Sequence, residues 1–125
     1  MVNPKYPQEI NHSQVLKLVE KEDVESLIAV VKTNRSPAVL KHAILFLGGS
    51  KVKEAVEPLI VLLSSDFASV RHYSAWALGQ IGDKKAIDPL STLLNQIKEN
   101  DLVREAVIKA LAELGGDEGN DLFEI

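Results

Sequence analysis

The chain repeats one short residue pattern three times. Residues 56–60 (VEPLI) recur as residues 87–91 (IDPLS), and a weaker copy, residues 24–28 (VESLI), precedes both. The leucines at the centre of the three copies are separated by 32 and then 31 residues. A period of this length is typical of a stack of two-element units, because one such unit cannot bury its apolar face alone. The repeats therefore restrict the fold to a solenoid.

Each copy predicts a pair of helices. In the first helix of a pair the apolar residues recur at i, i+3, i+4 and i+7. In the middle copy these residues are Val56, Leu59, Ile60 and Leu63. The second helix is richer in small residues, such as Ala75 in the middle copy and Ala110 in the last. Small side chains let neighbouring helices approach closely, so we expect the second helices to pack tightly.

Prolines and capping residues mark the predicted helix starts. Pro58 and Pro89 fit a first turn, where the missing N–H would have no partner in any case. The first helices should therefore begin near residues 55–57 and 86–87. The predicted N-caps of the second helices are Ser36, Asp66 and either Asn100 or Asp101.

Glycines are the predicted ends of the second helices, since glycine adopts the left-handed conformation readily. They are Gly48-Gly49, Gly82 and Gly115-Gly116. Asn11 and Gln14 form a predicted capping box for one more helix, which extends to about Glu20. The sequence leaves open whether this N-terminal helix is separate or continues into residues 23–32 as one bent helix.

The middle repeat carries a family pattern in this order: Val70-Arg71, Ala77, Leu78-Gly79, Ile81-Gly82-Asp83 and Ala86-Ile87-x-Pro89-Leu90. This pattern resembles the short HEAT-like repeat of the phycobilisome lyase type. The match is good over residues 86–116 and poor over residues 23–52, where Leu40 replaces the arginine. Arg71 and Arg104 occupy the family's arginine position. The resemblance implies a structural hydrogen bond or ion pair for each, with Asp83 as the expected kind of partner, and an anion site is the alternative.

The resemblance implies an all-α fold. It would be a right-handed α-α superhelix (solenoid) of about three HEAT-like helix pairs with an N-terminal capping helix. The implied domain organisation is residues 1–22 as N-terminal segment and capping helix, residues 23–52, 53–85 and 86–116 as the three repeats, and residues 117–125 as an acidic C-terminal tail.

Composition excludes several classes of function. The 125 residues include no cysteine, which rules out a disulfide scaffold, a thiol nucleophile and a zinc site with cysteine ligands. The formal net charge of −4 argues against nucleic-acid and acidic-membrane partners, since binding phosphates needs a basic surface. No apolar run reaches the roughly 18 residues of a membrane span, and the N-terminal residues lack the apolar core of a signal peptide. We expect a cytoplasmic protein.

The histidines are the main candidates for a metal site. One HEAT-like family of metal-dependent hydroxylases holds a di-iron site on His-Glu dipeptides of successive repeats. None of the three histidines here is followed by glutamate. His42 and His72 could approach each other across the stack, but two imidazoles without a carboxylate make a poor ligand set. We therefore predict no metal, no cofactor, no catalytic residue and no enzyme activity.

The exposed side of the second helices is the predicted partner-binding surface. The resemblance implies that this side lines the concave face of the superhelix. Trp76 and its neighbours form an aromatic centre with charged residues around it, which is typical of a protein-binding hot spot. In the alternative interpretation Trp76 only packs on the adjacent helix. The predicted partner-binding residues are His42, Leu45, His72, Tyr73, Trp76, Gln80, Glu105, Lys109 and Glu113.

The sequence thus favours a non-catalytic protein-protein interaction module or assembly adaptor, which binds a protein or peptide partner through this concave face. The alternative is an accessory subunit of a chromophore lyase or of another enzyme. A homodimer stays open as well, because residues 122–125 could cover the end of the third repeat in their own chain or in another.

Overall fold

The computed structural model describes residues 10–96 and 98–115, and these residues form α-helices and short 3-10 turns without any strand. The predicted all-α fold with seven helices is confirmed for this part of the chain. The α-helices are α1 (His12–Glu20), α2 (Val24–Thr33), α3 (Pro37–Gly49), α4 (Val56–Leu62), α5 (Ala68–Ile81), α6 (Ile87–Leu94) and α7 (Asp101–Gly115). None of the described helices is long and apolar enough to cross a membrane.

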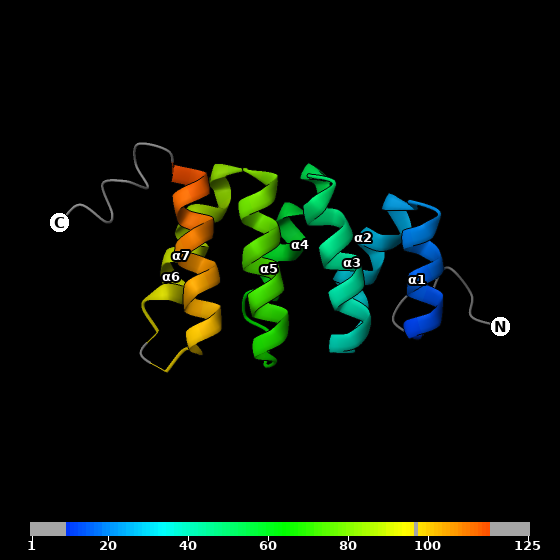
Figure 1. The fold of residues 1–125 in the computed structure, drawn as a ribbon, viewed down its shortest axis with the longest axis horizontal. Helices are drawn as coiled ribbons and strands as arrows, with labels where there is room; N and C mark the ends of the chain where they lie inside the picture. The colour runs from blue at the N-terminus through cyan, green and yellow to red at the C-terminus, as the bar shows by residue number, and fades with distance from the viewer. Residues whose placement is uncertain (1–9, 97, 116–125) are drawn as a thin grey trace.

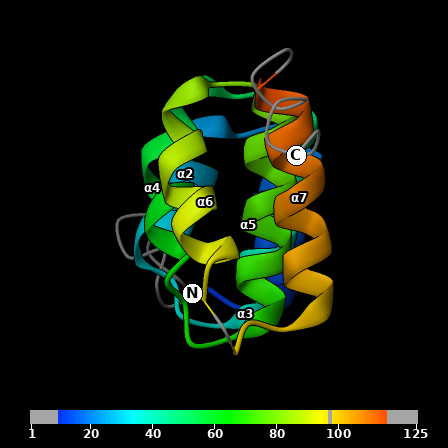
Figure 2. The ribbon, with the colours of Figure 1, turned by 90° about the vertical axis from the view of Figure 1, so that its left-hand side faces the viewer.

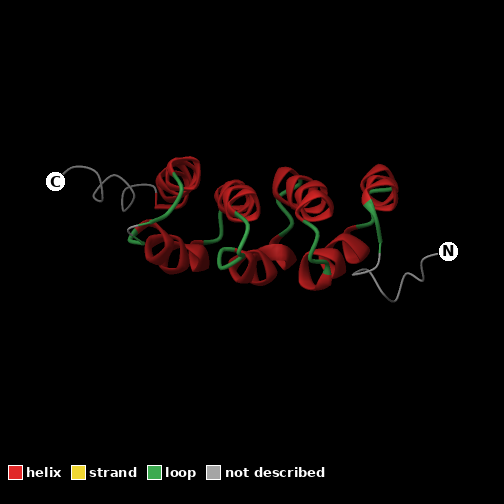
Figure 3. Ribbon diagram, turned by 90° about the horizontal axis from the view of Figure 1, so that it is seen from below, coloured by secondary structure: helices red, strands yellow, loops and turns green. Residues whose placement is uncertain are grey.

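The helices form two layers. The first helices of the repeats, α2, α4 and α6, make one layer, and the second helices, α3, α5 and α7, make the other together with α1 (Figures 1 and 3). The view along the stack shows the first-helix layer on one side and the second-helix layer on the other (Figure 2). The most extensive contacts between helices are those of α5 with its two neighbours in the second-helix layer, α3 and α7. We call the outer surface of α1, α3, α5 and α7 the second-helix face.

The N-terminal helix is separate from the first repeat. Its predicted capping box is present: the side chain of Asn11 accepts from the backbone N–H of Gln14, and the side chain of Gln14 accepts in return from the backbone N–H of Asn11. A turn follows α1, in which Glu22 takes a left-handed conformation with φ 54°. Asp23 then caps α2 by accepting from the N–H of Ser26 at 3.1 Å. Helices α1 and α2 are therefore separate, and they do not form the single bent helix that the sequence also allowed.

Helices α4 and α6 begin where their prolines predicted. One predicted N-cap, that of α5, is wrong. Helices α4 and α6 begin at Val56 and Ile87, as predicted, and each is preceded by a short 3-10 turn, Lys53–Ala55 and Lys84–Ala86. Asp66 does not cap α5, because the N-cap position is one residue later at Phe67, whose side chain makes no capping hydrogen bond.

The remaining predicted caps are present. Ser36 accepts from the N–H of Val39 at the start of α3, and the side chain of Asn100 accepts from the N–H of Leu102 at 2.8 Å. The described residues therefore show Asn100, not Asp101, as the capping side chain of α7.

The first two second helices end at the predicted glycines, α3 at Gly49 and α5 just before Gly82, but only Gly82 has the predicted left-handed conformation. Gly82 is left-handed with φ 82° at the end of α5. After α3, however, the left-handed residue is Lys51, with φ 54°, and neither Gly48 nor Gly49 takes that conformation. The predicted end at Gly116 and the acidic tail of residues 117–125 lie outside the described residues.

Gly48 is required by packing. An ideal Cβ at Gly48 would lie 2.6 Å from the Cβ of Ala77 and 2.9 Å from Trp76, closer than real side chains approach. One repeat later, an ideal Cβ at Gly79 would lie 3.0 Å from the Cβ of Ala110. Glycine at these two positions lets the second helices of successive repeats approach closely, and this close approach brings α3, α5 and α7 together into one continuous face.

Replacing Gly48 by alanine should lower the free energy of unfolding by about 1 to 3 kcal/mol, because the new methyl group overpacks a contact between two backbones. Gly49→Ala is the matched control: an added Cβ there meets nothing within 4 Å, so its effect should stay within about 0.5 kcal/mol. Urea titrations of both variants measure the difference. Equal effects would mean that α3 and α5 do not pack this closely.

The arginines of the family pattern have structural partners, but Asp83 is not one of them. Arg71 forms a bidentate ion pair with Glu99, with distances of 2.9 Å from Nε and 2.8 Å from Nη2, and donates to the carbonyl of Ser65. Arg104 donates to the carbonyl of Leu94 at 2.7 Å. Asp83 instead accepts from a backbone N–H in the following 3-10 turn. The expected structural role is observed, and the expected partner was wrong.

Candidate functional site

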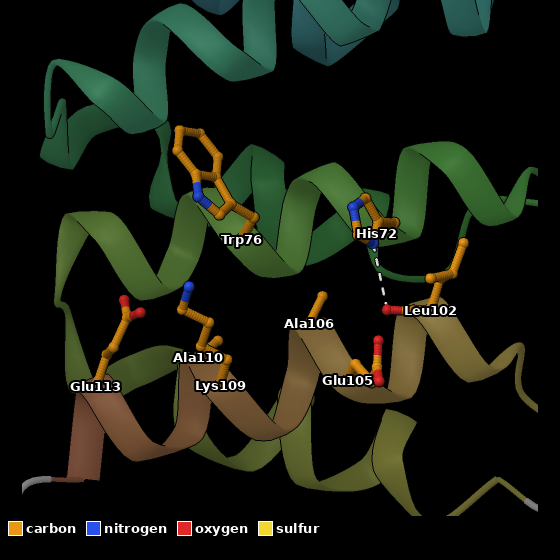
Figure 4. Close-up of a pocket in the computed structure, with 8 residues that line it drawn as sticks. All are labelled: His72, Trp76, Leu102, Glu105, Ala106, Lys109, Ala110 and Glu113. Carbon is orange, nitrogen blue, oxygen red and sulfur yellow. Dashed lines mark hydrogen bonds between the residues drawn. The ribbon is translucent and has the colours of Figure 1, made fainter.

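A groove on the second-helix face is lined by several of the predicted site residues. It lies between α5 and α7, has a volume of about 220 Å³ and brings five of the predicted residues together (Figure 4). Its lining residues are His72, Trp76, Leu102, Glu105, Ala106, Lys109, Ala110 and Glu113. The prediction missed the apolar lining residues, of which Ala106 and Ala110 share one face of α7 with Lys109 and Glu113 at helical spacing.

His72 is fixed in one tautomer at one end of the groove. Its Nδ1 lies 3.2 Å from the carbonyl oxygen of Leu102 on α7, and a carbonyl can only accept a hydrogen bond (Figure 4). In the neutral ring Nδ1 therefore carries the proton, and Nε2 is left as an acceptor. The groove thus offers a hydrogen-bond acceptor whose orientation is set by the neighbouring repeat.

Trp76 is half-buried, and it lies against α3 on one side and lines the groove beside α7 on the other. Its ring lies against α3, where Gly48 leaves room for it, while its near edge lines the groove toward α7 (Figure 4). The two interpretations of Trp76, packing residue and binding residue, are therefore compatible.

The α7 side of the groove carries more negative than positive charge. The carboxylates of Glu105 and Glu113 and the ammonium of Lys109 are all exposed on this helix. The side chain of Gln80 on α5 donates to Glu113 at 3.4 Å, a long hydrogen bond at the rim of the groove. The site therefore combines an apolar floor, an imidazole acceptor and two carboxylates.

The predicted residues of α3 do not line this groove. His42 lies against His12 of α1, with ring centroids 4.6 Å apart, and Tyr73 contacts His72 on one side and lies under the ammonium of Lys41 on the other. His12 was not among the predicted site residues, and it comes from α1, which lies outside the repeats. Leu45 is half-buried on the same helix as His42.

Comparison with known proteins identifies the repeats. The family model described as "HEAT repeats" matches residues 24–112. The chain belongs to the HEAT-repeat family. The comparison supports this general type of repeat and does not specifically support the phycobilisome lyase type.

Curated relatives of this HEAT-repeat chain are named as enzymes. It is 31% identical over 102 residues to deoxyhypusine hydroxylase-B of Oryza sativa subsp. japonica, a match that covers 81% of the chain and 34% of the relative. Deoxyhypusine hydroxylase of Gibberella zeae is 32% identical over 69 residues, covering 55% and 20%, and that of Drosophila melanogaster is 26% identical over 102 residues, covering 78% and 33%. The chain spans at most about a third of these relatives' length.

These relatives overturn two expectations. A non-catalytic interaction module and the absence of any enzyme function are contradicted by the names of the relatives, which are hydroxylases. The error came from treating the missing His-Glu dipeptide as evidence against enzyme function altogether. A short HEAT-repeat chain can share descent with an enzyme even where its own repeats have different surface residues.

The described side chains of this HEAT-repeat chain do not fit a di-iron site built on His-Glu pairs. Within residues 10–96 and 98–115, no three histidine, aspartate or glutamate side chains come together so that they could hold a metal ion. His12 and His42 meet as two imidazoles, and His72 uses Nδ1 on a carbonyl. Iron of this kind prefers carboxylates beside its imidazoles, so this donor set is unsuitable for it.

Proposed function

We propose that this chain functions as a HEAT-repeat accessory subunit of an enzyme of the hydroxylase kind, in which the groove between α5 and α7 holds a segment of the protein substrate. The observation that carries this proposal is the similarity to deoxyhypusine hydroxylases from a plant, fungi and insects, which extends over 81% of the chain in the rice relative. The accessory role was the alternative interpretation of the sequence, and these relatives favour it over the adaptor. They favour a hydroxylase over a chromophore lyase as the enzyme.

The donor set favours an accessory role. A hydroxylase of the His-Glu type needs carboxylates beside its imidazoles, and the described residues do not provide that combination. The oxidative chemistry would then belong to a larger partner subunit. The chain's contribution would be to bind and orient the substrate, a form of catalysis by positioning.

The groove suits a long cationic side chain. Deoxyhypusine is a lysine residue extended by an aminobutyl group, so it presents ammonium groups on an alkyl chain. The alanine floor and Trp76 can contact the alkyl part, while Glu105 and Glu113 can pair with the ammonium groups. His72 Nε2 adds an acceptor for an N–H donor. Lys109 opposes such a ligand and would have to turn toward solvent.

The test compares cells with and without the gene for this chain. We expect the deoxyhypusine residue of the substrate protein to remain without its added oxygen atom when the gene is deleted, as measured by mass spectrometry of the modified peptide. Restoring the wild-type chain should restore the oxygen. Complete hydroxylation in the deleted cells would overturn the proposed function.

A binding prediction tests the groove itself. Replacing Trp76 by alanine should weaken binding of a deoxyhypusine-bearing peptide by at least about 2 kcal/mol, roughly thirtyfold, because a central aromatic contact is lost. Lys84→Ala, on the exposed turn after α5, is the control and should leave binding unchanged. Isothermal titration measures both. Because Trp76 also packs on α3, circular dichroism must show that Trp76→Ala keeps its helix content, and full-strength binding by this folded variant would place the site elsewhere.

A further inference from the structure

The centre of the second-helix face lacks negative charge. Helices α3 (Pro37–Gly49) and α5 (Ala68–Ile81) contain no aspartate or glutamate, and α1 contains only Glu20, its last residue. The chain as a whole has a net charge of −4 and 18 acidic residues. Acidic side chains are therefore unevenly distributed, and the face formed by the starts of α1, α3 and α5 carries basic and aromatic groups.

Four of these groups form a connected cluster. His12 of α1 and His42 of α3 meet edge to face at 4.6 Å, and the ammonium of Lys41 lies 5.5 Å from the ring centroid of Tyr73 on α5. We call His12, Lys41, His42 and Tyr73 the imidazole cluster. It joins three successive helices of the second-helix layer, which stand side by side (Figure 1). Its contacts do not involve the groove between α5 and α7, except that Tyr73 also touches His72.

Positive charge is crowded in the imidazole cluster. Burial lowers the pKa of His42 below its ordinary value, and the neighbouring His12 and Lys41 lower it further because each repels a second positive charge. Among the residues that the structure describes, no carboxylate opposes this shift. Three groups that are or can become cationic thus lie together, and they would all be stabilised by a bound anion.

We propose that the imidazole cluster docks an acidic segment of a partner protein. Charge complementarity favours carboxylates: Lys41 and the two imidazoles can donate hydrogen bonds to them, and Tyr73 supports Lys41 from beneath. A nucleic acid is disfavoured, because the strand would extend toward α7, where Glu105 and Glu113 are exposed. This docking surface is independent of the proposed function, since it uses different residues and a ligand of opposite charge.

Peptide titrations test the proposal directly. A short glutamate-rich peptide should bind the full chain at about 50 mM salt, and a lysine-rich peptide of equal length should not. The triple variant His12→Ala, Lys41→Ala, His42→Ala should bind the acidic peptide about tenfold more weakly. The control is Lys53→Ala, Lys84→Ala, which removes two exposed positive charges at turns outside the cluster. Circular dichroism checks that each variant keeps its helix content.

The dependence on pH gives a second readout. Within the described part of the chain, the charged groups that act on the His42 imidazole are His12 from α1 and Lys41 from its own helix, and Tyr73 of α5 lies beneath Lys41. A bound carboxylate should raise the pKa of His42, so affinity should increase as the pH falls from about 7.5 to about 5.5. Nuclear magnetic resonance of the His42 ring should show the shift on adding peptide.

Three results would overturn the docking proposal. They are equal weakening in the triple variant and its control, an unchanged His42 titration at saturating peptide, and binding of an oligonucleotide at least as tight as that of the acidic peptide. The Trp76→Ala variant separates the two sites: it should keep acidic-peptide binding even if the proposed groove function fails.

Discussion

Replacing Glu99 by glutamine should lower the free energy of unfolding by about 3 kcal/mol at neutral pH. The Glu99 side chain is only 2% exposed and accepts two hydrogen bonds from Arg71, which is itself 19% exposed. Removing one partner of a buried ion pair leaves the other charge without compensation, which costs about 3 to 5 kcal/mol in other proteins. We expect the low end of this range because Arg71 can still reach water. Urea unfolding followed by circular dichroism measures the change.

Glu105→Gln is the matched control, since it removes the same charge from an exposed position on α7. Its effect should stay within about 0.5 kcal/mol. If both variants lose equal stability, the Arg71–Glu99 pair contributes only as much as any surface carboxylate, and the connection between the second and third repeats must depend on other contacts.

The pair also has a predicted pH dependence. The hydrogen bonds from Arg71 hold the pKa of Glu99 below its ordinary value, and the N–H of Asn100 lowers it further. A carboxyl group whose pKa is lower in the folded state stabilises the fold at pH values above its unfolded pKa of about 4.3. That contribution is lost as the pH falls through the folded pKa. The stability difference between wild type and Glu99→Gln should therefore be constant near neutrality and shrink below about pH 4.

The sequence predicted the helix pairs because their signals are local. A proline in the first turn or an asparagine before a helix acts within a few residues, and Pro58, Pro89 and Asn11 all stand where they were expected. The partner of Arg71 could not be predicted in this way. Glu99 lies in the loop before α7, outside the repeated pattern, and its approach to Arg71 depends on how two repeats stack.

The candidate groove was predicted in part for the same reason. Helical spacing places Trp76, Glu105 and Glu113 on one face, and the structure brings them into one groove. The spacing could not show that Trp76 would pack against Gly48, or that His12, on a helix outside the repeats, would contact His42. Function was predicted least well, because surface residues of a repeat protein reveal charge and shape but not descent.

Replacing Leu78 by alanine should lower the free energy of unfolding by about 2 to 5 kcal/mol. Leu78 has no exposed surface, and it lies on α5, which packs against α3, α4 and α7. Truncation removes buried methyl groups and leaves a cavity that the close contacts at Gly48 and Gly79 prevent from collapsing. The loss should therefore fall in the upper half of this range, and it should appear in a urea titration as a shift of the midpoint with an unchanged slope.

Ser74→Ala is the control for Leu78→Ala because Ser74 lies one turn earlier on the same helix and is equally buried. Its hydroxyl group is buried without a hydrogen-bond partner among the described residues, so removing it eliminates an uncompensated desolvation and leaves almost no cavity. We expect no loss of stability, or a gain of up to about 1 kcal/mol. A loss at Ser74 as large as that at Leu78 would show that any truncation in α5 is destabilising. In that case apolar burial at Leu78 would not be what holds the three repeats together.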